Sequence, residues 1–411
     1  MKLLRLDSER ALYSIVGYML LELCVGILNL WSVFQLPVSQ VFGWEYGSVV
    51  LVSSFFMIAF VTGSFAHGLL ASRFHPRFIC YLGTILHAGG FFLSSLLLGG
   101  SVWGIYFSFG ITIGLGCGLI HNSSVFGVMS WLPNRKGFAA GLAGTSFSVS
   151  TIILSTMIQG LMKVMPLSKV FQVVGAICLT VMLVGSSMVC VPSVQKLANM
   201  ETPEGSRAGK KLREAVSDVR FWLIALQIFL FSGSWNVIIP IIKPLGMVRG
   251  LSESLAGFTV IFVGVIMIAG KLCMGPISDV IGRKNALMIS CMAYAFGAAL
   301  LIFGTGWVYM TGIWLPAFAF AAGGCIVPAL VSDSFGPKYS GAIYGCAFYG
   351  SALSSIVMNK IATTVNAAGA VTGNYTFTFI LCIVISFGAA FTVYILNRVN
   401  QKMISRDESN I

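Results

Sequence analysis

A short basic sequence motif occurs twice in the chain, and the two copies are separated by about half of its length. The first copy occupies residues 68–77 and the second residues 275–284, an offset of 275 − 68 = 207 in a chain of 411 residues. Each copy lies between two long apolar runs, which predicts a tight basic turn joining two membrane helices. A duplicated helical bundle is typical of a transporter whose two halves rock around a central site.

The composition excludes a soluble domain. Apolar residues make up 57% of the chain and charged residues 9%, against about half and about a quarter in soluble domains. Runs of about 20 apolar residues, the length that spans a bilayer, recur along the whole chain. They predict twelve spans, at about 11–36, 45–72, 78–100, 102–130, 138–162, 168–192, 221–243, 252–276, 283–304, 307–331, 338–363 and 374–397.

The placement of Lys and Arg predicts the orientation of these spans. Of the 25 Lys and Arg residues, four lie in segments on one side (Lys163, Lys169, Lys243 and Arg249), two lie within spans (Lys271 and Lys360), and the remaining 19 lie on the other side. Because basic residues concentrate on the cytoplasmic side of membrane proteins, both termini are expected to be cytoplasmic. The net charge of +12 follows from this asymmetry and does not indicate a nucleic-acid partner.

These observations predict an all-α polytopic membrane protein with twelve transmembrane helices in two pseudo-symmetric six-helix bundles. Residues 1–192 form the N-terminal bundle, the polar stretch 193–220 is a cytoplasmic linker, and residues 221–411 form the C-terminal bundle. Residues 209–219 are compatible with a short amphipathic helix on the membrane surface. The ten cysteines lie singly in or beside apolar spans, which predicts a packing role and neither a disulfide framework nor a metal site.

Ionisable and polar residues inside the spans are the candidates for function, because placing them in a bilayer is costly. Glu22 lies near the middle of the first span, and His121 and Asn122 lie in the fourth. Glu22 is interpreted either as a proton acceptor or counter-ion of an empty site, or as a structural group that hydrogen-bonds a neighbouring helix. His121 is interpreted either as a proton-carrying substrate contact or as a packing histidine.

The seventh predicted span contains residues that weaken an α-helix. Trp235 and Asn236 follow the sequence Ser-Gly-Ser at 232–234, and Pro240 lies beyond them. Such a helix can unwind where it lines a cavity, so both residues are candidates for substrate binding. An interfacial position for Trp235 is the alternative.

The chain resembles known transporters in several motifs. Residues 275–284 are close to the Gly-x-x-x-Asp-x-x-Gly-Arg-Lys loop of the major facilitator superfamily, and the first copy has Ser72 in place of the Asp. The segment 131–141, Trp-Leu-Pro-Asn-Arg-Lys-Gly-Phe-Ala-Ala-Gly, together with 26–37 and 114–121, resembles the oxalate/formate antiporter family, relatives of the monocarboxylate transporters. The resemblance implies transport of small carboxylates, by exchange or together with a proton.

The resemblance also implies roles for individual residues. Lys271 stands in span 8 where the family often has Arg, and Ser351 stands where some members have Lys. Asn29 and His121 align with family tyrosines. One cation in place of two suits a monoanion better than oxalate. The candidate substrate-binding residues are Lys271, His121, Asn122, Asn29, Trp235, Asn236 and Ser351; those for proton coupling are Glu22 and His121.

The two basic loops are expected to brace the inner gate, through Arg73, Arg77, Asp279, Arg283 and Lys284. For Lys271, snorkelling to the inner surface is the alternative to substrate binding.

Taken together, the sequence predicts a secondary active transporter of small organic anions, most simply a monocarboxylate, working by proton symport or anion exchange. The alternative is a proton-coupled exporter of a drug-like or cationic compound, which Glu22 favours and Lys271 opposes. A channel would need no two-bundle repeat, and a membrane enzyme would need a catalytic cluster that the sequence lacks; a sensor without flux stays open.

No cofactor is expected. The expected partners are the carboxylate, a proton or counter-anion, and the bilayer of the cell membrane, with the chain acting as a monomer.

Overall fold

The computed structural model describes residues 2–192, 209–372 and 374–409, and within these it is built from helices joined by short turns. This architecture follows from the solvent, because a lipid-exposed segment satisfies its backbone hydrogen bonds internally only as a helix or in a closed barrel. Within the described residues, eleven helical segments are long and apolar enough to cross a bilayer. The broken helix at the N-terminus completes the predicted set of twelve spans.

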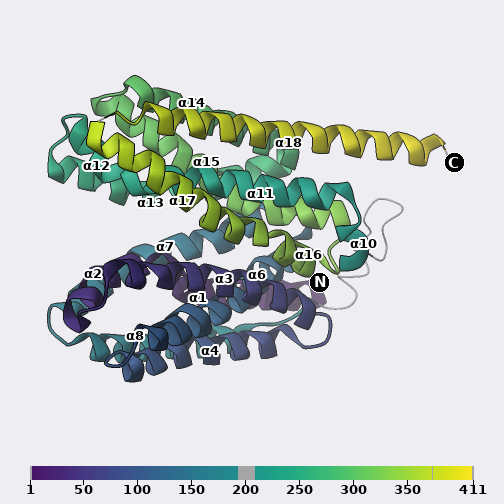
Figure 1. Cartoon of the computed structure of the whole chain (residues 1–411). Coiled ribbons are helices and arrows are strands. Elements are labelled where there is room, and N and C mark those ends of the chain that lie inside the picture. The colour runs from purple at the N-terminus through teal and green to yellow at the C-terminus, as the bar shows by residue number, and fades with distance from the viewer. Residues whose placement is uncertain (1, 193–208, 373, 410–411) are drawn as a thin grey trace. The chain divides into compact units, whose positions relative to one another are not determined.

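The first six spans follow one another with short connections (Figure 1). Span 1 consists of α1 (Lys2–Val25), the 3₁₀ turn η1 (Gly26–Asn29) and α2 (Trp31–Phe42). The others are α3 (Tyr46–Leu70), α4 (Pro76–Leu97), a composite fourth span of α5 (Val102–Ile105), the π-helical η2 (Tyr106–Ile113) and α6 (Gly114–Trp131), then the 3₁₀ turn η3 (Pro133–Arg135) with α7 (Lys136–Met162), and α8 (Leu167–Met188).

The second six spans repeat the pattern. After the short helix α10 (Leu212–Val216), span 7 consists of α11 (Val219–Ile238), the 3₁₀ turn η4 (Ile239–Ile241) and α12 (Ile242–Val248). Spans 8 to 12 are α13 (Glu253–Ile281), α14 (Arg283–Phe303), α15 (Gly306–Phe335), the pair α16 (Ser340–Ala347) and α17 (Tyr349–Thr372), and α18 (Thr376–Ser409). The predicted linker segment 193–208 lies outside the described residues, and the surface helix expected at 209–219 is reduced to the five residues of α10.

The predicted breaks and turns have local causes. Span 7 breaks at Ile239–Ile241, where Pro240 lacks a backbone N–H, a few residues beyond the predicted weak point. In the second basic turn, Gly282 has φ = +88°, a conformation that residues with a Cβ rarely adopt. Its counterpart in the first copy is His75 (75 + 207 = 282), which has φ = −65° and accepts a hydrogen bond from the Arg77 N–H as an N-cap. The two basic turns are therefore alike in sequence but differ in backbone conformation.

The helices form two compact units. Unit 1 contains residues 1–210 and 335–349, and unit 2 contains residues 211–334 and 350–411. In unit 1, α8 packs against both α1 and α4, and in unit 2, α18 packs against both α11 and α14. Spans 1, 3 and 6 and spans 7, 9 and 12 thus make the same contacts, as expected of a duplicated bundle.

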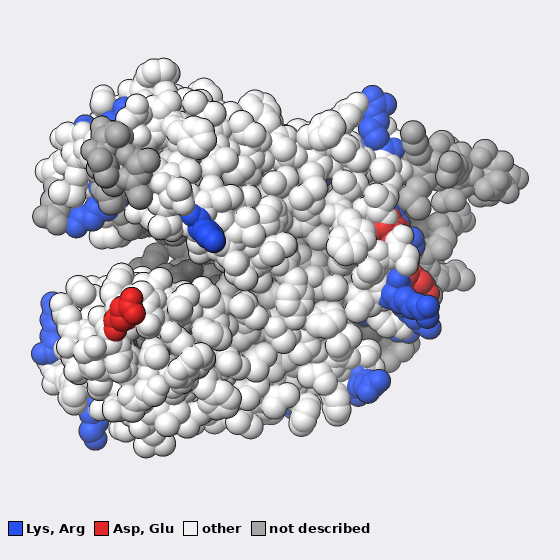
Figure 2. Space-filling model, viewed as in Figure 1, with Lys and Arg blue, Asp and Glu red and all other residues white. Residues whose placement is uncertain are grey.

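Each unit has its own buried core. In unit 1, Phe109 of the π-helical segment contacts five other aromatic rings, with the centroid of Trp31 at 4.5 Å and those of Phe34, Phe56, Phe91 and Phe171 at 5.8 to 6.1 Å. In unit 2, a cluster extends from Phe231 and Trp235 through Tyr294 to Phe379. Charged side chains gather mainly at the helix ends, with a broad uncharged surface between them (Figure 2), as a bilayer requires.

Close backbone contacts between helices depend on glycine. A Cβ on Gly116 of α6 would lie 2.6 Å from the backbone nitrogen of His87 in α4, whereas a Cβ on Gly89 of α4 would meet nothing within 4 Å. We expect Gly116→Ala to separate α4 from α6 and lower the free energy of unfolding by about 1–3 kcal/mol. Gly89→Ala should leave it unchanged or raise it by up to about 1 kcal/mol. Thermal unfolding in detergent measures both, and equal melting temperatures would contradict the packing argument.

Candidate functional site

A buried carboxylate and an imidazole form an ion pair in unit 1. Glu22 lies in the last turn of α1, and its Oε1 and Oε2 lie 3.1 and 3.3 Å from Nδ1 of His121 in α6. The Glu22 side chain is fully buried, and that of His121 is 16% exposed. The residues are 99 positions apart, so the contact joins the two helices within the bundle.

The surroundings of this pair are mostly apolar. The His121 ring lies between those of Phe60 at 5.4 Å and Phe147 at 5.8 Å. Cys117 of α6 and Tyr344 of α16 lie within electrostatic range of the Glu22 carboxylate. A low-dielectric environment strengthens the attraction between the two groups and penalises either charge alone.

The helix break of span 1 follows directly after Glu22. The Gly26 N–H donates to Oγ of Ser150 at 3.1 Å, and the Thr151 hydroxyl donates to the Gly26 carbonyl at 3.3 Å. A Cβ on Gly26 would lie 2.5 Å from the Ser150 Oγ, so only glycine fits this contact. Asn29 ends the turn, and its side chain lies outside the described part of the chain. The backbone groups released by the break are thus satisfied by α7, which holds the end of α1 in place.

Asn122, predicted to bind substrate, joins three helices. Its Nδ2 donates to the carbonyl oxygens of Ser64 in α3 at 2.6 Å and of Gly341 in α16 at 3.0 Å. The side chain is fully buried. Its amide N–H groups therefore hold α6 against α3 and α16. This contact differs from that of His121, its neighbour in sequence, which pairs with Glu22.

Lys271 is buried in α13 of unit 2, with 8% of its surface exposed. It lies ten residues before the end of the helix at Ile281, a distance of about 15 Å along the axis. The Cys325 thiol of α15 lies 3.9 Å from the backbone carbonyl oxygen of Lys271. A snorkelling lysine keeps its ammonium group in water, so this burial favours the interpretation of Lys271 as an intramembrane cation.

The remaining predicted substrate residues are also in unit 2. The Trp235 ring stacks on Phe320 with centroids 5.3 Å apart and an interplanar angle of 11°. Trp235 is 5% exposed, which differs from the interfacial position considered as its alternative. Within the described residues, Asn236 Nδ2 is buried without a hydrogen-bond partner, and Ser351 of α17 is 6% exposed. Trp235 and Asn236 lie on the stretch of α11 just before its break, and Phe320 belongs to α15.

The second basic turn forms an ionic cluster within unit 2. Arg283 contacts Asp279 at 2.5 Å and Asp333 at 3.0 Å, and it donates to Oγ of Ser278 at 2.6 Å. Asp333, at the end of α15, was not among the predicted residues. An acidic group at the end of a predicted span could have been recognised as a partner for the loop arginine.

Arg77 and Lys284, at equivalent positions of the two copies, make equivalent contacts. Arg77 donates to the Val189 carbonyl at 3.0 Å and approaches the Cys190 Sγ at 3.7 Å. The Lys284 ammonium group donates to Oδ1 of Asn397 at 3.1 Å. Since 77 + 207 = 284 and 190 + 207 = 397, both cations tie the third helix of a bundle to the end of its sixth. Arg73, in contrast, is exposed.

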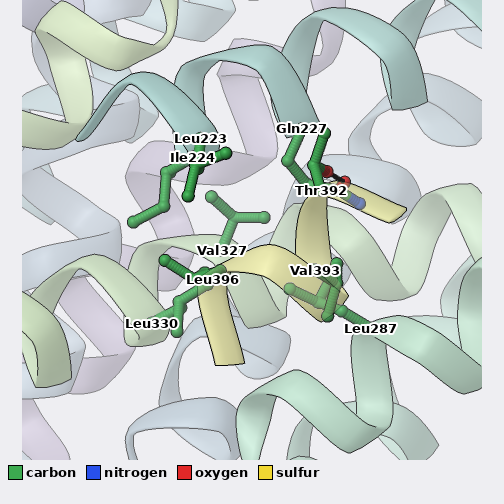
Figure 3. Close-up of a pocket in the computed structure, with 9 residues that line it drawn as sticks. All are labelled: Leu223, Ile224, Gln227, Leu287, Val327, Leu330, Thr392, Val393 and Leu396. Atoms are coloured by element: carbon green, nitrogen blue, oxygen red, sulfur yellow. Dashed lines mark hydrogen bonds between the residues drawn. The ribbon is translucent and has the colours of Figure 1, made fainter. Parts of the chain in front are cut away.

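A separate hollow in unit 2 lies among α11, α14, α15 and α18 (Figure 3). It is lined by Leu223, Ile224, Gln227, Leu287, Val327, Leu330, Thr392, Val393 and Leu396. The Thr392 hydroxyl donates to Oε1 of Gln227 at 2.6 Å, so its polar groups satisfy each other. This hollow contains none of the predicted site residues.

Comparison with known proteins identifies the family. The sequence profile described as Major Facilitator Superfamily matches residues 15–359, and the chain belongs to this superfamily. It is a membrane transporter and not an enzyme. An MFS-type transporter of Escherichia coli K12, YhjX, is 23% identical over 353 residues, which are 84% of this chain and 85% of that protein.

Two further similarities bear on the chain. Rat monocarboxylate transporter 9 is 30% identical over 174 residues, which are 42% of this chain and 34% of that protein. Among solved structures, the proton:xylose symporter XylE has a TM-score of 0.72 at 15% identity, covering 94% of this chain and 96% of its own. The human organic anion transporter MFSD10 has a TM-score of 0.67 at 15% identity, covering 94% of this chain and 99% of its own. The predictions of fold class and superfamily are confirmed.

The cluster around Arg283 provides a test. Asp279 is 10% exposed and Asp333 is 39% exposed, so the first contact is less screened by water. We expect Asp279→Asn to lower the free energy of unfolding by on the order of 1–2 kcal/mol, and Asp333→Asn to lower it less. Thermal unfolding of both variants, with Glu45→Gln at an exposed helix start as the control, gives the order. A larger effect at Asp333 would contradict this assignment.

Proposed function

We propose that the chain is a secondary active transporter of a small monocarboxylate, which it moves by alternating access. The observation that carries this proposal is the burial of Lys271 within a membrane-spanning helix. A cation buried within a membrane-spanning helix is a functional group by default, and a carboxylate is its simplest ligand. A single lysine provides a point charge for one carboxylate and not the two forks that a dianion would fit best.

Similarity to relatives supports the same class of substrate. The match to monocarboxylate transporter 9 covers less than half of either chain, so it supports the class and not the particular acid. Five buried side-chain atoms of unit 2 lack a partner within the described residues, and four of them can donate a hydrogen bond: Asn236 Nδ2, Trp314 Nε1 and the hydroxyls of Tyr294 and Ser354. Donors suit an anionic ligand, because a carboxylate only accepts hydrogen bonds.

The Glu22–His121 pair supports coupling to a proton. A histidine changes charge within the physiological pH range, and its contact with a buried carboxylate gives the proton two neighbouring sites. Symport of a monoanion with one proton moves no net charge. Anion exchange is the other mode, and it would need a counter-substrate on the opposite side at every pH.

A proton-coupled exporter of cationic or drug-like compounds is the second candidate. Glu22 favours it, since a buried carboxylate is the expected ligand for a cation. In the structure, however, this carboxylate is already paired with His121, which leaves it less available for a cationic substrate. The two candidates differ in the charge of the ligand, which is directly measurable.

Ligand binding by the purified protein tests the function. A ligand that binds only the folded state raises the melting temperature. We expect small monocarboxylates to raise it, and lipophilic cations to leave it unchanged. Counterflow in proteoliposomes then separates a carrier from a sensor, because unlabelled substrate inside accelerates labelled uptake only in a carrier. Stabilisation by cations alone would overturn the proposal.

The role of Lys271 is tested by two substitutions. Lys271→Gln removes a charge-assisted hydrogen bond of about 1.5–3 kcal/mol, so substrate affinity should fall by about 10- to 150-fold. Lys271→Arg keeps the charge and should retain part of the affinity. Lys360→Gln, at an exposed lysine of α17, is the matched control. Equal affinity in the wild type and in Lys271→Gln would exclude this assignment.

The proton-carrying pair is tested by pH-driven uptake. Glu22→Gln mimics the protonated side chain, so exchange of substrate for substrate should continue while uptake driven by a pH gradient is lost. His121→Asn removes the other proton site and should also abolish pH-driven uptake. Glu45→Gln, at an exposed carboxylate, should behave like the wild type. If both variants retain pH-driven uptake, neither residue carries the proton.

A further inference from the structure

Residues 335–349, called the strap below, pack within unit 1 although the chain on both sides of them belongs to unit 2. At the start of the strap, the Lys210 N–H donates to the Phe335 carbonyl at 2.8 Å. At its end, the Tyr349 hydroxyl donates to Oγ1 of Thr62 at 3.0 Å. A break between α16 and α17 at Phe348 lets this part of span 11 follow α3. The strap is thus a distinct element with its own attachment.

The centre of the strap lies in backbone contact with α3. A Cβ on Gly345 would lie 2.6 Å from the Phe65 Cα, and one on Gly68 would lie 2.5 Å from the carbonyl carbon of Gly341. The Asn122 amide group fastens this contact from α6, since it donates to both Ser64 and Gly341. No side chain fits between the two helices, so the strap is either seated fully or displaced.

The seated strap lies beside the Glu22–His121 pair. Tyr344 of the strap is 3% exposed and lies within electrostatic range of Glu22. Phe348 packs against Phe60 at 6.0 Å, and Phe60 packs against the His121 ring at 5.4 Å. Access to the pair from this direction therefore depends on the position of the strap.

A histidine is buried where the strap packs against α3. His67 of α3 is 5% exposed, and its Nδ1 is buried without a hydrogen-bond partner in the described structure. Its ring lies 3.7 Å from the position that a Cβ of Gly341 would occupy. The titratable groups on the neighbouring α6 and α16 are Cys117, His121, Tyr344 and Cys346, and within the described residues none of them forms a hydrogen bond with the Nδ1 of His67.

We propose that the strap is a pH-sensitive gate over the Glu22–His121 pair, seated while His67 is neutral and released when His67 is protonated. A charged imidazole without an acceptor cannot stay buried at low cost, whereas a displaced strap exposes it to water. Acidification on the side of the strap would then open the path to the proton-carrying pair. The regulatory meaning of the gate depends on the proposed coupling, but its movement does not.

Cys346 is a native reporter of the strap. It is half-buried in α16, so its labelling by a polar maleimide should increase when the strap leaves its seat. The rate in purified protein is divided by the rate in SDS-unfolded protein at the same pH, which removes the titration of the thiol itself. Cys346→Ser gives the background from other thiols. No substrate is needed, so the result is independent of whether the chain carries a carboxylate.

In the wild type, the normalised rate should rise several-fold between about pH 8 and about pH 5.5, the range in which histidine titrates. In His67→Gln it should stay constant. His87→Gln, at a fully buried histidine of α4, should keep the pH dependence of the wild type. Asn122→Ala should raise the rate at both pH values, because it removes the fastening to Gly341.

Three results would contradict the proposal that the strap is a pH-sensitive gate. The first is a normalised rate in the wild type that does not change with pH, and the second is a pH dependence that persists in His67→Gln. The third is a loss of pH dependence in His87→Gln as well. If Asn122→Ala does not fold, the wild type and the two histidine variants still decide the question.

Discussion

The cost of an unpaired backbone group in hydrocarbon is the constraint on which the rest of this structure depends. It makes every span helical, and it allows a break only where another group replaces the lost hydrogen bonds. At the break in span 1, Ser150 and Thr151 of α7 satisfy the backbone of Gly26. Near the break in span 7, the Asn366 amide of α17 donates to the Val237 carbonyl at 3.1 Å. The two breaks occur in the first helix of each repeat, beside the residues proposed to act in transport, as expected of discontinuous helices in transporters.

The two repeats share one stabilising contact between helices and differ in a second one. Both tie the third helix to the end of the sixth, through Arg77 in unit 1 and Lys284 in unit 2. The ionic cluster of Asp279, Arg283 and Asp333 exists only in unit 2. With the offset of 207, the corresponding positions in unit 1 are Ser72, Pro76 and Phe126, none of which carries a charge. Unit 1 instead seats the strap against glycine-rich backbone, so the ends of the two repeats are stabilised by different physical means.

The fold could be predicted from the sequence because apolar runs and basic turns are read within a few tens of residues, and the repeat is a match between two such short stretches. The site could be predicted only in part, because its contacts join distant segments. Glu22 and His121 were predicted separately, each from its intramembrane position, but their pairing depends on helix packing across 99 residues. Asn122 was predicted as a substrate ligand by the same reasoning, whereas its amide binds two carbonyl groups. Asp333 carried no motif, and its role became clear only from its contact with Arg283.

The pairing of Glu22 with His121 explains how a titratable site can persist in an apolar bundle. A lone carboxylate there would pay the full penalty of desolvation when charged. Paired with an imidazole, the site is neutral overall whether the shared proton resides on nitrogen or on oxygen. One further proton gives it a single positive charge, which is unfavourable in the same low-dielectric surroundings unless an anion enters the protein as well. An anion and a proton thus each lower the cost of the other, and this mutual dependence is what thermodynamic coupling between two ligands requires. A buried pair of this kind contributes little to stability by itself, which agrees with the proposal that it acts in coupling.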